Sequence, residues 1–145
     1  MKINDEPIVV EQTFNSSLSD VWNAITELDQ MHKWYFDNIP AFKAEVGFET
    51  EFIIENEGRV FPHKWKITEV VPLKKIAYSW NFEGYSGSSI SEFELFKEKD
   101  LVKLRLTVIV LEDFPENIPE FKRESCIGGW NYFINQRLKE YLETL

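Results

Sequence analysis

The chain has 145 residues, of which 43% are apolar and 28% charged, so we expect residues 1–145 to form a single globular domain with a real core. The formal charge of −9 repels phosphate backbones, and nucleic acid is therefore not an expected partner. The single cysteine, Cys126, excludes an intramolecular disulfide and a cysteine-rich metal site, and its setting indicates a small buried hydrophobe. Two histidines far apart give no metal-ligand spacing, so neither a metal nor another cofactor is expected.

The segment from Met1 to Phe14 lacks the basic end and the apolar stretch of a signal peptide. No window approaches the ~20 apolar residues that cross a bilayer. We therefore expect a cytoplasmic protein without a membrane span, in an oligomeric state that the sequence leaves open.

The first predicted elements are a strand and two short helices. Ile8–Phe14 alternates as a strand does. Ser17 and Asp20 have the spacing of a helix-capping box, and apolar residues follow at helical spacing. Leu28–Tyr35 predicts a second helix, which Trp34 anchors in the core.

Strands then recur at regular intervals, separated by turn residues. They are predicted at Phe48–Glu55, His63–Val70, Ile76–Phe82, Ile90–Phe96 and Leu101–Leu111. Together with the first strand they indicate an antiparallel sheet of six to seven strands.

Two of these strands carry aromatic side chains on one face. Successive side chains on a strand point to opposite faces, so residues two apart share a surface. One set is Phe61, His63, Trp65 and Ile67, and the other is Ile76, Tyr78, Trp80 and Phe82. A sheet face of this kind requires a cover. Strict alternation also places Glu69 on the His63 face, where it could pair with Arg137 or a ligand amine, although a solvated strand end is the simpler interpretation.

The cover is predicted at the C-terminus, where the hydrophobic period changes to that of a helix over Pro119–Leu145. Its apolar stripe comprises Ile127, Trp130, Ile134, Leu138, Tyr141 and Leu145. Gly128 and Gly129 lie inside this run at a cost of about 1 kcal/mol each, which a kink or a close approach of helix to sheet would explain. Strand, two short helices, sheet and long helix together define an α+β fold.

This order resembles the helix-grip fold of the START-like (SRPBCC, Bet v 1-like) superfamily, and within it the family related to the C-terminal domain of the Hsp90 ATPase activator. The resemblance rests on FNSSLSDVWNAIT, EVGFETEF, ITEVVPLKKIAYSW and GGWNYFINQRLKEYLE, which are spread over most of the chain. It implies a curved antiparallel sheet around the C-terminal helix. Members of the superfamily bind lipids, hormones or polyketides, catalyse reactions, or act as protein partners, and a shared fold does not assign one of these roles.

The predicted site is a cavity between the C-terminal helix and the sheet. Its expected ligand-binding lining is Phe52, His63, Trp65, Tyr78, Trp80, Trp130 and Ile134. His63 is the sharpest polar candidate, as a hydrogen-bond partner of a ligand or as a core histidine bonded to a neighbouring side chain. The competing interpretation of the aromatic face is a filled core.

Three functions remain open. The first is binding of an apolar or amphipathic small molecule in the cavity. The second, implied by the resemblance, is a protein-interaction module related to the Hsp90 activator. The third and weakest is an enzyme of the same fold, because no catalytic constellation surrounds His63 and no catalytic residue is assigned.

Overall fold

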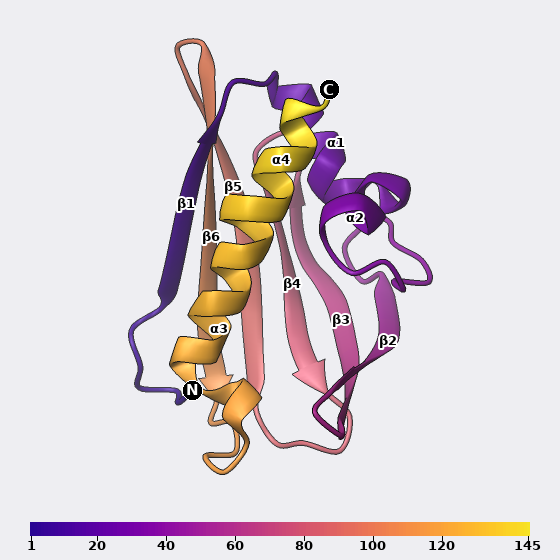
Figure 1. The fold of residues 1–145 in the computed structure, drawn as a ribbon, viewed down its shortest axis with the longest axis vertical. Coiled ribbons are helices and arrows are strands. Elements are labelled where there is room, and N and C mark those ends of the chain that lie inside the picture. Colours follow the sequence, from indigo (N-terminus) through magenta and orange to yellow (C-terminus); the bar gives the residue numbers. More distant parts are fainter.

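Six strands form one antiparallel sheet in the computed structural model, which describes residues 1–145 (Figure 1). The strands are β1 (Ile8–Phe14), β2 (Glu49–Asn56), β3 (Arg59–Val71), β4 (Lys75–Phe82), β5 (Ser88–Glu98) and β6 (Leu101–Glu112). Their order in the sheet is β1-β6-β5-β4-β3-β2, so the first strand pairs with the last. The predicted α+β helix-grip architecture is confirmed, with six strands.

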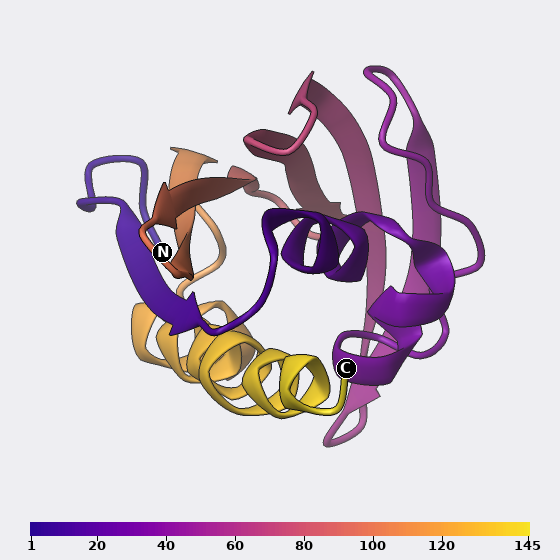
Figure 2. The same cartoon turned by 90° about the horizontal axis from the view of Figure 1, so that it is seen from above.

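The sheet curls around a long C-terminal helix, and the other helices lie on the same side of it (Figure 2). The helix consists of α3 (Arg123–Trp130), a π-helical segment η2 (Asn131–Leu138) and α4 (Lys139–Glu143). Its backbone is right-handed helical at both junctions, so these segments are one continuous rod.

The sequence predicted that the helix begins at Pro119, but it begins at Arg123. Pro119–Phe121 forms a separate 3₁₀ turn, η1, and Lys122 is extended, with φ −75° and ψ 148°. Proline suits the start of a short turn because it lacks an N–H, but the extended residue after it prevents the turn from joining the helix.

The buried stripe of the helix is Trp130, Ile134, Leu138 and Leu142, each at most 5% exposed. Four-residue spacing drifts by about 40° per step on an α-helix of 3.6 residues per turn. The wider i→i+5 turns of η2 oppose that drift and keep the stripe on the sheet. The predicted stripe was wrong at its end, because Leu142 is buried while Leu145 is 64% exposed.

Two short helices, α1 (Leu18–Thr26) and α2 (Leu28–Trp34), follow β1. Ser17 caps α1 as predicted, accepting a hydrogen bond from the Asp20 amide at 3.0 Å. Trp34 is fully buried and its Nε1 donates to the Ala24 carbonyl at 2.7 Å, which ties the two helices together.

Strict alternation is wrong at Glu69, which is exposed as the simpler interpretation predicted, and the close-approach explanation of the two helix glycines is wrong. The register between β3 and β4 shifts between Ile67 and Glu69, and this bulge turns Glu69 outward to pair with Lys75 at 3.1 Å. Gly128 and Gly129 are both exposed, and a Cβ at either would meet no atom within 4 Å. No close approach of helix to sheet therefore requires these glycines.

None of the helices combines the length and apolar character that a bilayer crossing requires.

Candidate functional site

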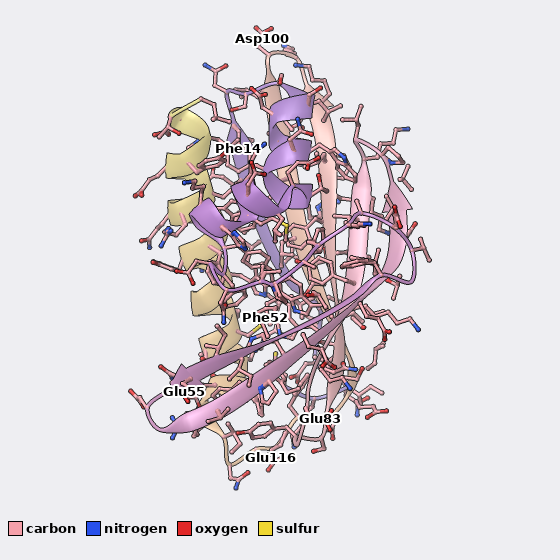
Figure 3. The ribbon with its side chains drawn as sticks, turned by 90° about the vertical axis from the view of Figure 1, so that its right-hand side faces the viewer. Phe14, Phe52, Glu55, Glu83, Asp100 and Glu116 are labelled. Atoms are coloured by element: carbon pink, nitrogen blue, oxygen red, sulfur yellow. The ribbon has the colours of Figure 1, made fainter.

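A cavity of about 430 Å³ opens between the start of the C-terminal helix and the concave face of the sheet. It lies toward the end of the molecule where Figure 3 shows Glu55, Glu83 and Glu116, opposite the β5–β6 turn at Asp100. Most of its lining is apolar, and five of the six strands contribute to it. The lining residues are Met1, Phe36, Ile54, Glu55, Asn56, Phe61, His63, Trp80, Phe82, Ser89, Ser91, Val108, Phe114, Glu120, Phe121, Cys126, Gly129, Trp130 and Phe133.

Aromatic rings from separate segments meet around the cavity. Trp80 of β4 and Trp130 of α3 pack edge to face, with ring centroids 5.5 Å apart. Phe36, just after α2, packs against Phe133 of η2 with centroids 5.0 Å apart. Edge-to-face pairs are favourable and orient both rings, so these contacts fix part of the cavity wall.

His63 lies on the cavity wall and is 6% exposed. Its ring stacks on Phe52, the residue opposite it on β2, with centroids 4.9 Å apart. Its Nδ1 lies 2.9 Å from the carbonyl oxygen of Phe61. A carbonyl oxygen only accepts hydrogen bonds, so Nδ1 carries the proton and Nε2 of the neutral ring carries a lone pair.

Burial lowers the pKa of His63 from 6.5 to about 4, although the hydrogen bond to Phe61 acts in the opposite direction. The imidazole is therefore uncharged at neutral pH. Nε2 makes no hydrogen bond within the protein. It is also not fully enclosed by other atoms. It is thus an accessible acceptor on a residue that lines the cavity.

Three further polar side chains line the interior. Ser89 Oγ donates to the Trp80 carbonyl at 3.0 Å, so its proton is already used. Ser91 also lines the cavity, and the residue is only 1% exposed. Burial raises the pKa of Cys126 to about 11, which keeps the thiol protonated and unreactive at neutral pH.

A charged clamp borders the cavity where the β2–β3 hairpin meets η1. Arg59 donates from Nε and Nη2 to the two carboxylate oxygens of Glu120, at 2.8 and 2.7 Å. Asn56 adds a third bond to Glu120 at 2.7 Å. Arg59 beside it lowers the pKa of Glu120 to about 2. Because paired bonds between Arg and carboxylate are directional, the clamp holds hairpin and turn in a fixed relation at this rim.

Of the seven residues expected to line the cavity, the structure brings three to it: His63, Trp80 and Trp130. The other four, Phe52, Trp65, Tyr78 and Ile134, are at most 6% exposed within the main hydrophobic core. The interior is thus divided into a filled half and a hollow half. Tyr35 occupies the filled half, where its ring stacks on Trp65 with centroids 5.4 Å apart.

Sequence reasoning included Trp130 but missed most of the aromatic lining residues from outside the two aromatic strands. Phe36 follows α2 and Phe133 lies within η2, so neither has a strand alternation to mark it. Phe114 and Phe121 lie in the connection between β6 and the helix. The high aromatic content, 15%, was the one available signal, but it does not say which rings meet.

The curved sheet, its gripped helix and the cavity between them define a helix-grip protein. The family model described as activator of Hsp90 ATPase homolog 1-like protein matches residues 15–143, and the chain belongs to that family.

Several solved structures share the fold of this chain. Protein CV1439 from Chromobacterium violaceum is 21% identical, with a TM-score of 0.76 over 94% of this chain and 96% of that one. The Aha1 dimer from Colwellia psychrerythraea is 21% identical, with a TM-score of 0.73 over 96% of this chain and 97% of that one. DynU16, from the dynemicin biosynthetic locus, is 22% identical, with a TM-score of 0.74 over 97% of this chain but 48% of that one. At these identities the likeness establishes the fold alone. None of the curated proteins matches the chain.

Proposed function

We propose that this protein binds an apolar or amphipathic small molecule in the cavity beside Trp80 and Trp130. The observation that carries the proposal is a cavity of about 430 Å³ with aromatic walls and an unused imidazole acceptor. Ligand sites are typically concave, mainly apolar, about 300–1,000 Å³ in volume, and contain a few polar groups that orient the ligand. A cavity filled by its own side chains would not leave Nε2 of His63 accessible.

The first test is a search for the ligand. Native mass spectrometry of freshly purified protein should reveal a bound mass. A fluorescence screen of flavonoids, fatty acids and aromatic acids should quench Trp80 and Trp130, which both line the cavity. A protein that carries no ligand and whose tryptophan emission responds to no compound would contradict the proposal.

The two adjacent helix glycines provide a matched pair of variants. A Cβ at Gly128 or Gly129 would meet no atom within 4 Å, and both residues are exposed. Only Gly129 lines the cavity. Gly129→Leu should therefore weaken binding of any ligand found by at least about 10-fold, since its side chain competes for the same space. Gly128→Leu should leave the affinity within about 2-fold while changing helix propensity equally. Equal effects of the two variants would place the ligand elsewhere.

The family description favours a second candidate, a protein-interaction module that contacts an Hsp90-type chaperone. Its test is the ATPase rate of the chaperone with and without this protein. Stimulation that Gly129→Leu leaves unchanged would support this candidate and separate it from cavity binding. An enzymatic role has less support, because a histidine with a pKa of about 4 is a weak base and the cavity thiol is protonated.

A further inference from the structure

His63 presents a fixed hydrogen-bond acceptor to the cavity, as does Ser89, whose proton is bonded to the Trp80 carbonyl. The Phe61 carbonyl holds the proton on Nδ1, at 2.9 Å, so Nε2 can accept a hydrogen bond but cannot donate one. Exchanging the two nitrogens by turning the ring over would break the Nδ1 hydrogen bond to Phe61. The ring stacks on Phe52 on one side and meets Phe82 edge to face with centroids 4.7 Å apart. A ligand group opposite Nε2 must therefore supply an O–H or N–H.

Charge selects further among such ligands. No lysine or arginine side chain lines the cavity, whereas Glu55 and Glu120 do. Arg59, the basic side chain of the clamp, already donates to both carboxylate oxygens of Glu120. The amino group of Met1 at the rim donates to the Phe121 carbonyl at 2.7 Å. The Met1 ammonium is thus the only cation among the lining residues, against the carboxylates of Glu55 and Glu120, and a carboxylate entering the cavity would lose its water for at most that one opposite charge.

We propose that the cavity selects an uncharged aromatic ligand that carries a hydroxyl or N–H donor, which bonds to Nε2 of His63, and that it discriminates against the corresponding ether and carboxylate. This inference rests on the proposed small-molecule function. The lowered pKa of His63 is consistent with it, because the ring stays neutral instead of forming an ion pair with an acid. The Ser91 hydroxyl, which lines the same cavity, can rotate to donate or accept and so imposes no such selection.

Three probes with the same ring system separate these requirements: 2-naphthol, 2-methoxynaphthalene and 2-naphthoate. A bicyclic ring fits a cavity of this size, and the probes differ only in the polar group. Calorimetric titration at neutral pH should show 2-naphthol binding about 5- to 10-fold tighter than 2-methoxynaphthalene, the worth of one net hydrogen bond. 2-Naphthoate should bind at least about 10-fold more weakly than 2-naphthol, because its charge is desolvated.

Nitrogen NMR of the imidazole gives a readout that needs no variant. The free protein should show Nδ1 protonated and Nε2 unprotonated, and only 2-naphthol should shift the Nε2 signal. His63→Phe preserves an aromatic ring at the site and should reduce the preference for 2-naphthol over 2-methoxynaphthalene to within about 2-fold. Ser91→Ala, the control from the same wall, should leave that preference intact.

The outcomes separate this inference from the proposed function. If 2-methoxynaphthalene or 2-naphthoate binds as tightly as 2-naphthol, the cavity is a ligand site but the donor requirement is wrong. An Nε2-protonated imidazole in the free protein would overturn the inference in the same way. The proposed function itself fails if none of the three probes binds and if Gly129→Leu does not change the affinity for any ligand found in the screen.

Discussion

The hydroxyl oxygens of Tyr35 and Tyr78 lie 2.9 Å apart, and both residues are buried. This bond joins the residue after α2 to the middle of β4. The Tyr35 ring also stacks on Trp34 with centroids 4.4 Å apart. Burial raises the pKa of both tyrosines, so each stays protonated. The pair therefore fills the half of the interior that adjoins the cavity, and it anchors the helical segment to the sheet.

Removing both hydroxyls of this pair should cost less than the two single removals added together. Tyr78→Phe leaves the Tyr35 hydroxyl without its partner, and we expect a loss of about 1–3 kcal/mol in the free energy of unfolding. The double variant Tyr35→Phe/Tyr78→Phe leaves no buried hydroxyl, so its loss should be smaller than the sum of the two single losses. Urea unfolding of the four proteins measures the coupling. Strictly additive losses would show that the bond contributes nothing.

Trp130 should be the most sensitive position of the C-terminal helix. Its ring packs on Trp80 and on Phe93, with centroids 5.5 and 5.7 Å away. Trp130→Ala should lower the free energy of unfolding by about 3–5 kcal/mol, since the surrounding rings cannot collapse into the space. Tyr132→Ala, on the exposed side of the same helix at 44% exposure, should cost less than about 1 kcal/mol. Similar melting temperatures for the two variants would contradict the packing of this helix face in the core.

Glycines of the chain should respond to alanine with opposite signs. Gly128→Ala and Gly129→Ala should each raise the free energy of unfolding by about 0.5–1 kcal/mol, because both positions are helical and an added Cβ meets no atom within 4 Å. Gly87→Ala should be destabilising, since φ is +111° and its Cβ would collide with the Phe114 ring. Chemical unfolding compares the three, and destabilisation by Gly128→Ala would restore the close-approach explanation.

Burial of His63 should make stability depend on pH. Its pKa falls from 6.5 when unfolded to about 4 when folded, so the unfolded chain binds the extra proton between these values. The contribution of the neutral His63 to the free energy of unfolding is fully present above pH 6.5. It is lost as the pH falls to about 4, at up to about 1.4 kcal/mol per pH unit. The difference between the stability curves of the wild type and His63→Phe isolates this slope. A difference that is flat over the window would mean that the histidine is exposed in the folded protein.

The sequence by itself determined the local pattern of the fold. Strand alternation placed Phe61, His63, Trp65 and Ile67 on one buried face, and all four are at most 6% exposed. Ser17 marked the start of α1 through a bond between neighbours in the chain. The helix after β6 followed from its hydrophobic period, although the extended Lys122 moved its start to Arg123. Such features depend on residues a few positions apart, so a single sequence carries them.

Only the tertiary structure decided which part of the aromatic interior is hollow. Tyr35 reaches from the end of α2 to Tyr78 and closes the space over Trp65, while a cavity remains beside His63. The same holds for the proton on His63, since it depends on the Phe61 carbonyl and on burial by Phe36 and Phe82 from distant segments. Packing joins residues that no short-range period relates. The cavity and its chemistry therefore emerge only when the sheet closes around the helix.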